Sequence, residues 1–318
     1  MSSGPADIAM VPRRVTRAER IAEDIYMIEL RDPAGADLPE FTAGAHVAVR
    51  APNGMVRKYS LANDPAERDR YVIAIKREVP GRGGSKSMIR DVSVGSELLV
   101  AAPVNNFALA KSPAGYVFVA GGIGITPIMA MIRHLAVTGG RFKLYYCTRS
   151  ADATAFRDEL MSDFRGQVVI HHDAGDPAKA LDLWPILEKP KGHLYCCGPR
   201  GLMQAVRDMT GHWLPSAVHF EAFSDTAPRS DDRPFMVRLA RTDATIEVPV
   251  GTTILEALRA HGLDVPSSCE SGTCGTCRTK LIAGEADHRD LVLADDERAG
   301  NIMVCVSRAL SDTLVIDR

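Results

Sequence analysis

Short apolar runs alternate with polar turns through the first hundred or so residues. Runs rich in β-branched and aromatic residues cover 26–30, 46–49 and 71–75, and turns such as Pro52-Asn53-Gly54 separate them. Short strands at this spacing are typical of an antiparallel sheet that closes on itself. We therefore predict an antiparallel β-barrel domain over residues 1–111.

From residue 112 the pattern changes, and apolar strands alternate with helical segments. The strand-like runs cover 116–120, 142–147, 168–172 and 193–197. This alternation is typical of a doubly wound α/β domain with a parallel sheet. We place that domain at residues 112–225.

A third part follows a polar stretch. Residues 225–234 contain two prolines and few apolar side chains, so we place a linker at 226–233. Strands are expected at 235–239 and 245–248, and Thr253 and Glu256 have the spacing of a capping box at the start of a helix. These signals predict an α+β domain over residues 234–318.

Composition narrows the possible partners and the compartment. The 318 residues are 46% hydrophobic and 25% charged, and their formal net charge is −2, which gives no reason to expect nucleic acid or an anionic membrane as partner. No apolar run approaches the roughly 20 residues that span a bilayer. The first residues lack a secretory apolar core, and the seven cysteines are an odd number. We therefore expect a cytoplasmic protein.

Four cysteines have the spacing of an iron–sulfur site. Cys269, Cys274 and Cys277 form a C-x4-C-x2-C pattern, and Cys305 follows at a distance. This is the plant-type [2Fe-2S] pattern, in which two irons need four thiolates. Zinc ligands more often come as two short pairs, and disulfides fit poorly with seven cysteines and no secretion signal. The spacing favours a [2Fe-2S] cluster over both alternatives.

Two segments of the barrel domain indicate a flavin phosphate. In the first, an arginine can hold a phosphate, a tyrosine can cover a ring system and a serine can bond its edge. The second is a glycine cluster before a helix start, which leaves N–H groups for a phosphate, although a flexible loop is the alternative for either segment alone. The candidate residues are Arg57, Lys58, Tyr59, Ser60, Gly81, Arg82, Gly83, Gly84, Ser85 and Ser87.

A glycine turn between a strand and a helix indicates a dinucleotide site. Gly122 and Gly124 follow the strand at 116–120, and Pro127 suits the first helical turn. The fingerprint expects an acidic residue at the end of the next strand, where Thr148 and Arg149 stand instead. The nearest acidic strand-end residue is Asp173, which would bond a ribose hydroxyl and repel a 2′-phosphate. Asp173 favours NADH, whereas Arg149 weakly favours NADPH.

Another strand of the same sheet ends at Cys197, Gly198 and Pro199. Parallel sheets bind ligands at this edge, so a small, polarizable Cys197 beside a nicotinamide is one interpretation. A buried structural cysteine is almost as good an interpretation. His171 and His172 lack a third ligand at useful spacing and are interpreted as strand-end residues.

Taken in order, these motifs resemble those of the ferredoxin–NADP reductase-like flavoproteins that carry a C-terminal plant-type ferredoxin. Within that group the resemblance is to the reductase components of Rieske ring-hydroxylating oxygenases, and it covers nearly the whole chain. It implies an FMN domain, an NADH domain and a β-grasp [2Fe-2S] ferredoxin domain. It also implies flavin contacts from Ala74, Ile75, Lys76 and Thr126, and it places Phe223 where nicotinamide meets the flavin.

The resemblance implies an NADH-dependent reductase. Hydride would pass from NADH to FMN, with Ser60, Cys197 and Phe223 at the reacting rings, and single electrons would pass through the cluster to the oxygenase. One alternative is a redox-sensing protein that uses the same sites without turnover. Another is an FAD-containing reductase of a different monooxygenase, but no aromatic platform for an adenine is evident, so FMN is favoured.

Overall fold

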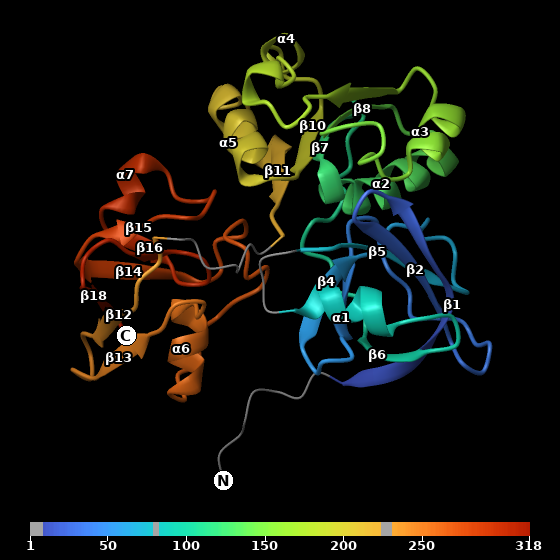
Figure 1. Cartoon of the computed structure of the whole chain (residues 1–318). Helices are drawn as coiled ribbons and strands as arrows, with labels where there is room; N and C mark the ends of the chain where they lie inside the picture. Colours follow the sequence, from blue (N-terminus) through green and yellow to red (C-terminus); the bar gives the residue numbers. More distant parts are fainter. Residues whose placement is uncertain (1–8, 79–82, 224–230) are drawn as a thin grey trace. The chain divides into compact units, whose positions relative to one another are not determined.

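The chain forms two compact units, residues 1–220 and 221–318 (Figure 1). The computed structural model describes residues 9–78, 83–223 and 231–318. None of the helices in these ranges is long and apolar enough to cross a membrane.

The N-terminal sheet is the predicted antiparallel barrel. Its six strands run in the order β4-β3-β6-β1-β2-β5, and the pairings between them are antiparallel. A bridge between Leu61 and Ile73 joins the end of β4 to β5, so the two outer strands of that order meet. The strands are β1 (Met10–Ala22), β2 (Ile25–Arg31), β3 (His46–Arg50), β4 (Val56–Ser60), β5 (Tyr71–Lys76) and β6 (Glu97–Ala101).

The longest strand, β1, was not among the predicted ones. It has 13 residues, many of them charged, and only one side of it faces the core, as the buried Val15 shows. The charged side chains on its outer face interrupt the alternation of apolar and polar residues on which strand prediction depends. The helix α1 (Gly84–Asp91) lies between β5 and β6 in the sequence and begins after Gly83, whose φ of 87° is in the left-handed region.

The second sheet is parallel and doubly wound, as predicted. Its order is β11-β10-β7-β8-β9. The strand order therefore reverses between β7 and β10, because β8 and β9 lie on one side of β7, and β10 and β11 lie on the other. Ligands of such sheets bind at this reversal, outside the carboxyl ends of the strands. The strands are β7 (Tyr116–Gly121), β8 (Phe142–Thr148), β9 (Val168–His172), β10 (His193–Cys197) and β11 (Val218–Glu221). The helices are α2 (Ile125–Thr138), α3 (Arg157–Asp163), α4 (Trp184–Leu187) and α5 (Arg200–Met209), with 3-10 turns η1 (Gly122–Gly124), η2 (Pro177–Lys179) and η3 (Pro215–Ala217).

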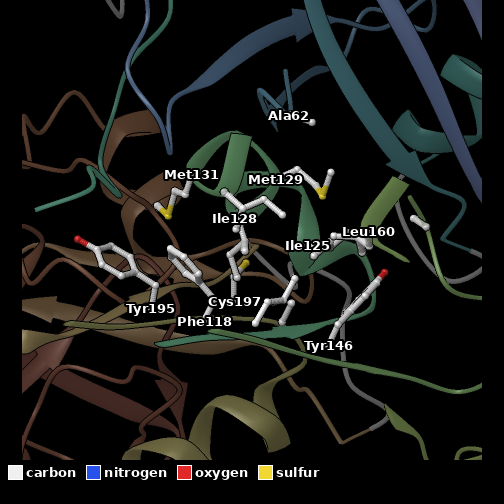
Figure 2. Packing of buried hydrophobic residues seen from close by; sticks show 14 of the residues in the cluster. Ala62, Phe118, Ile125, Ile128, Met129, Met131, Tyr146, Leu160, Tyr195 and Cys197 are labelled. Carbon is white, nitrogen blue, oxygen red and sulfur yellow. The ribbon is translucent and has the colours of Figure 1, made fainter. Parts of the chain in front are cut away.

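One apolar core joins the barrel to the parallel sheet. Ile128 and Met131 of α2 pack in the same cluster as Phe118 of the sheet and Ala62 of the barrel (Figure 2). All four side chains are fully buried. Because α2 contributes to both contacts, its position is tied to the barrel as well as to its own sheet.

The second unit is a small α+β domain. Its main sheet has the order β13-β12-β18-β14-β16, with β12 and β18 parallel, and β15 and β17 form a separate pair. The predicted capping box is confirmed, since Thr253 Oγ1 accepts from Glu256 N at 3.0 Å and Glu256 Oε2 accepts from Thr253 N at 2.8 Å. The elements are β12 (Phe235–Leu239), β13 (Thr245–Val248), α6 (Ile254–Ala260), β14 (Arg278–Ala283), β15 (Ala286–Asp287), α7 (Asp295–Arg298), β16 (Asn301–Met303), β17 (Arg308–Ala309) and β18 (Thr313–Ile316).

The predicted linker lies largely outside the described residues, which resume at Asp231. Asp232 already belongs to the second unit, because its buried carboxylate accepts from Arg289 Nη2 at 2.5 Å. The barrel and the parallel sheet share one unit. The predicted boundaries at 111/112 and around 226–233 stay predictions.

Candidate functional site

The strand β4 presents the predicted flavin residues on two faces. Arg57 and Tyr59 pair with buried residues of β3 and share their face, while Lys58 and Ser60 lie on the opposite face. On that second face, burial and the Lys58 charge lower the pKa of His46 to about 4. The register therefore separates Lys58 from the arginine and tyrosine that it was grouped with.

The two predicted phosphate segments meet in space. A Cβ built on Gly84 would lie 3.0 Å from Nε of Arg57, so the guanidinium group lies directly against the first turn of α1. The first N–H groups of a helix have no partner inside it, and they form an anion site together with an adjacent arginine. Gly83 and Gly84 thus place backbone donors and the Arg57 charge at one point.

The remaining loop residues have mixed placements. Ser85 Oγ accepts from Glu78 N at 3.2 Å, whereas Ser87 is buried and donates to the Gly84 carbonyl at 3.1 Å inside its own helix. Gly81 and Arg82 lie outside the described residues. The phosphate site is therefore best supported at Arg57, Gly83, Gly84 and Ser85.

Tyr59 supplies an observation that fits a bound ring system. Its hydroxyl is buried and has no hydrogen-bond partner among the described residues, and burial raises its pKa to about 12, against the opposing effect of Arg57. A buried unpaired hydroxyl is costly unless a ligand satisfies it. Ala74 and Ile75 are buried core residues of β5, and Lys76 ends that strand half-exposed. The chain thus offers an anion site for a phosphate and an unpaired tyrosine hydroxyl, and both fit a bound flavin.

Close contact between two glycine turns forms the nucleotide edge. A Cβ on Gly121 would lie 2.5 Å from Cδ of Pro199, and one on Gly124 would overlap the Cys197 carbonyl and lie 2.7 Å from the Gly198 nitrogen. The turn after β7 therefore rests against the turn after β10, at the reversal of the sheet. This contact requires glycine and brings together the two motifs that the sequence placed at this edge.

The first turn of α2 completes that edge. Thr126 is buried and donates to the Ile123 carbonyl at 3.0 Å, and Pro127 follows it inside the first turn. Gly122 has a φ of 52° with open space beside it, and the Tyr146 hydroxyl donates to its carbonyl at 3.0 Å. Cys197 is fully buried and ends β10 behind this turn, so both earlier interpretations of it stay open.

Thr148, Arg149 and Asp173 are brought together at the ends of β8 and β9. The Asp173 N–H donates to the Thr148 carbonyl at 3.1 Å, and the Asp173 carboxylate accepts from Gly175 N at 2.8 Å. Arg149 is exposed, and its Cδ lies 4.0 Å from a Cβ built on Gly175. A carboxylate and a guanidinium group thus lie in two adjacent loops, while the buried Thr148 hydroxyl bonds internally to His172 at 2.9 Å.

The four cluster cysteines form two pairs. Cys269 N donates to Cys274 Sγ at 3.5 Å, and the thiols of Cys277 and Cys305 are hydrogen-bonded to each other. Within the described ranges none of the seven cysteines forms a disulfide, and no three His, Cys, Asp or Glu side chains converge on one point. Two thiol pairs suit two irons with two ligands each, and they fit a dinuclear cluster better than a single zinc.

Small polar residues between the cysteines form hydrogen bonds with the sulfurs. Ser271 N and Thr273 N donate to Cys269 Sγ at 3.4 and 3.5 Å, and Thr276 Oγ1 lies 3.3 Å from Cys274 Sγ. Burial raises the pKa of Cys269, but hydrogen bonds from Ser271, Thr273 and Cys274 outweigh it and lower the value to about 6. Such donors stabilise thiolate ligands. The small loop residues thus let the backbone aim N–H groups at the Cys269 sulfur.

The cluster loop is anchored from outside. Arg259 of α6 donates to Glu270 Oε1 at 2.9 Å, and Gly272 has a φ of 75° with Asp290 and Val306 against it. Cys277 and Cys305 are buried, whereas Cys274 is exposed. One thiol pair therefore reaches the surface of this unit. Phe223, the predicted nicotinamide neighbour, belongs to the second unit and is 37% exposed.

Comparison with protein families agrees with these sites. Residues 237–310 match the 2Fe-2S iron-sulfur cluster binding domain, and residues 12–109 match the oxidoreductase FAD-binding domain. Together with the geometry, these matches assign a [2Fe-2S] cluster to the second unit and a flavin to the barrel.

Relatives match along nearly the whole length of the chain. The chain is 54% identical to phthalate 4,5-dioxygenase oxygenase reductase subunit of Pseudomonas putida, with 99% of each chain covered. It is also 54% identical to phthalate dioxygenase reductase of Burkholderia cepacia, with 98% and 99% covered. A solved structure of phthalate dioxygenase reductase, described as modular for electron transfer from pyridine nucleotides to [2Fe-2S], matches with a TM-score of 0.79 and 53% identity, covering 99% of this chain and 100% of that one.

Proposed function

Because the chain belongs to the phthalate dioxygenase reductase family of flavin and [2Fe-2S] oxidoreductases, we propose that it carries electrons from NADH to a Rieske-type oxygenase that acts on an aromatic acid. The observation that carries the proposal is the presence, in one chain, of an anion site for a phosphate, a dinucleotide edge and two thiol pairs. A sensor without turnover would not need all three. The free thiols around an iron–sulfur site support a reducing, cytoplasmic location.

The barrel residues would bind and orient FMN. Arg57 and the N–H groups after Gly83 would hold its phosphate, while Tyr59 would cover the ring and Ser60 would lie at its edge. A flavin accepts a hydride as an electron pair and releases electrons singly. FMN is proposed over FAD because these residues account for one phosphate and no aromatic platform for an adenine is evident.

The parallel sheet would position NADH. Its pyrophosphate would lie at the first turn of α2, where Gly122 and Gly124 allow close approach of the backbone. Thr126 and Cys197 would face the reacting rings from this side. Hydride transfer needs no protein acid or base, so these residues act by holding the two rings in contact.

The thiol pairs would hold the cluster that delivers single electrons. The donors to Cys269 stabilise the thiolate form, and the exposed Cys274 places one pair at the surface where an acceptor can approach. Clusters of this class have reduction potentials of about −400 mV, which suits the delivery of electrons to a Rieske centre.

The proposal is tested by cofactor content and by acceptor choice. Flavin released by heat is identified by mass spectrometry, and iron and sulfide are counted. NADH oxidation is then followed with purified oxygenase components, including a phthalate dioxygenase oxygenase. We expect FMN, two irons and two sulfides per chain, and rapid turnover with at least one oxygenase. Intact FAD would overturn the flavin assignment, and turnover with none of the oxygenases would overturn the proposed acceptor.

Nucleotide preference is expected to depend on Asp173. A 2′-phosphate beside this carboxylate would meet like-charge repulsion in a partly desolvated loop. Replacing Asp173→Ser should lower kcat/KM for NADH and raise it for NADPH, with a shift in their ratio of roughly tenfold or more, because about 1.4 kcal/mol corresponds to a factor of ten. Arg149 lies in the adjacent loop after β8 and could then receive the phosphate.

Steady-state kinetics with both nucleotides measures this shift. Asp176→Ser is the matched control, because Asp176 lies in the same loop but caps η2 by accepting from Ala178 N at 3.0 Å. An unchanged NADH/NADPH ratio in Asp173→Ser would place the selectivity in other residues.

A further inference from the structure

Arg133 connects the two halves of the first unit. It lies on α2, and its Nε and Nη2 donate to the two carboxylate oxygens of Glu159 on α3 at 2.7 and 2.5 Å. Its Nη1 donates to the carbonyl of Ala62 in the barrel, and its guanidinium group lies 5.5 Å from the centre of the Phe156 ring. We call these contacts the Arg133 clamp. One planar group therefore holds two helices and one barrel segment.

The barrel side of the clamp is rigidly held. Asn63, beside Ala62, is 1% exposed, and its amide accepts from Val72 N at 2.9 Å and donates to the Arg70 carbonyl at 3.0 Å. Ala62 N itself donates to the Val72 carbonyl at 2.8 Å. The Ala62 carbonyl is thus part of the barrel closure, so a group bonded to it takes its position from the barrel.

Two of the elements that the clamp joins also carry candidate ligand contacts. The barrel segment carries a flavin contact, and α2 carries a contact at the dinucleotide edge. Ala62 is two residues beyond Ser60, the last residue of β4. Arg133 is seven residues beyond Thr126 on α2, which is about 10 Å along a helix at about 1.5 Å per residue. The clamp therefore fixes the helix start that faces the dinucleotide edge relative to the strand that carries Tyr59.

We propose that Arg133 is a positioning residue for hydride transfer, setting the distance between the nicotinamide held by the parallel sheet and the flavin held by the barrel. This inference rests on the proposed transfer from NADH to flavin. It assigns Arg133 no contact with either ring, because its contacts are with Glu159, Ala62 and Phe156.

Folding and hydride transfer differ in how large a displacement of α2 against the barrel each tolerates. The apolar core that α2 shares with the barrel already holds the halves together, and a partly buried ion pair adds little to net stability. The rate of hydride transfer is far more sensitive to such a displacement than stability is, since a misplacement of about 1 Å can lower a rate about 100-fold. A fork that bonds three acceptor oxygens in one plane restricts sliding of α2 against the barrel more than apolar contacts do.

The test compares Arg133→Met with Arg133→Lys in the full-length, cofactor-loaded protein. Methionine keeps much of the apolar stem and loses the donors, whereas lysine keeps the charge but cannot form the planar fork. Stopped-flow measures the limiting rate of flavin reduction and the NADH concentration at half-maximal rate. The long-wavelength absorbance of stacked nicotinamide and flavin is recorded in the same experiment. Flavin content and the melting temperature serve as folding readouts.

We expect the limiting rate to fall between about 10- and 100-fold in both variants, by the same misplacement argument. The half-saturating NADH concentration should change less than threefold, and the stacking absorbance should weaken. Arg141→Met is the control, because Arg141 is exposed just before β8 and its Nη2 donates to the Pro113 carbonyl at 2.9 Å, away from the Arg133 clamp. Its rate should equal that of the unsubstituted protein.

Three results would overturn the inference. A full rate in Arg133→Met would show that the clamp is dispensable, and a full rate in Arg133→Lys would show that charge alone suffices. A lower rate with unchanged stacking absorbance would place the effect elsewhere. If Arg133→Met fails to fold, Glu159→Gln weakens the same clamp more mildly and should lower the rate in the same way. Failure of the proposed function looks different, since the unsubstituted protein itself would then not be reduced by NADH.

Discussion

Replacing Cys274→Ala should abolish electron delivery to a one-electron acceptor while NADH still reduces the flavin. Cys274 is exposed and contributes one thiol of the Cys269 pair, so its loss leaves one iron with a single protein ligand and no cavity in the core. Mutation of a group that only supports a metal ligand lowers the affinity for the metal about 10- to 100-fold. Removal of a ligand itself should therefore lower the rate of electron delivery roughly 100-fold or more. The flavin site lies in the other compact unit and should be unaffected.

Iron and sulfide counts, the visible spectrum and cytochrome c reduction by NADH measure the outcome. Cys147→Ala is the matched control, because this half-buried thiol belongs to the parallel sheet, and burial raises its pKa to about 11, helped by the Asp173 charge. The control should keep both iron and electron delivery. Two irons per chain in Cys274→Ala would contradict the ligand assignment, and loss of the flavin would contradict the independence of the two units.

Replacing Gly124 with Ala should strongly slow the reduction of the flavin by NADH. The new Cβ would overlap the Cys197 carbonyl and lie 2.7 Å from the Gly198 nitrogen. Both obstacles are backbone, which cannot rotate away, so the turn before α2 must separate from the turn after β10. That displacement moves the edge where the pyrophosphate would lie, and a shift of about 1 Å is expected to lower the reduction rate about 100-fold. The melting temperature should fall as well, because close packing is lost.

Gly201→Ala provides the comparison for Gly124→Ala. Gly201 is in the first turn of α5, close in sequence to the same edge, but no atom lies within 4 Å of a Cβ placed there. Alanine favours a helix over glycine by up to about 1 kcal/mol, so this variant should keep its rate and gain slightly in stability. Dithionite should still reduce the cluster in both variants. A normal NADH rate in Gly124→Ala would show that the two turns need not touch.

The chemistry of the chain was largely predictable because short-range patterns carry it. The cysteine spacing indicated the cluster, and the glycine turn before Pro127 indicated the dinucleotide edge. The capping box at Thr253 and Glu256 was confirmed to the residue, since it depends on side chains three positions apart. Apolar runs also located β7, β8, β9 and β10 of the parallel sheet, whereas the short strand β11 was not predicted. The strand β1 was missed because its charged outer face interrupts that pattern.

Tertiary structure decided which of these residues meet. Nothing in the spacing of Gly124 predicts that the Cys197 carbonyl rests against it, or that Arg57 lies over Gly84. The pairing of Cys277 with Cys305 and the bond from Arg133 to Ala62 likewise join residues far apart in the chain. Local sequence determines backbone periodicity, turn geometry and ligand type, because these depend on neighbouring residues. Contacts between distant segments depend on how the sheets close and pack, and only the folded chain specifies them.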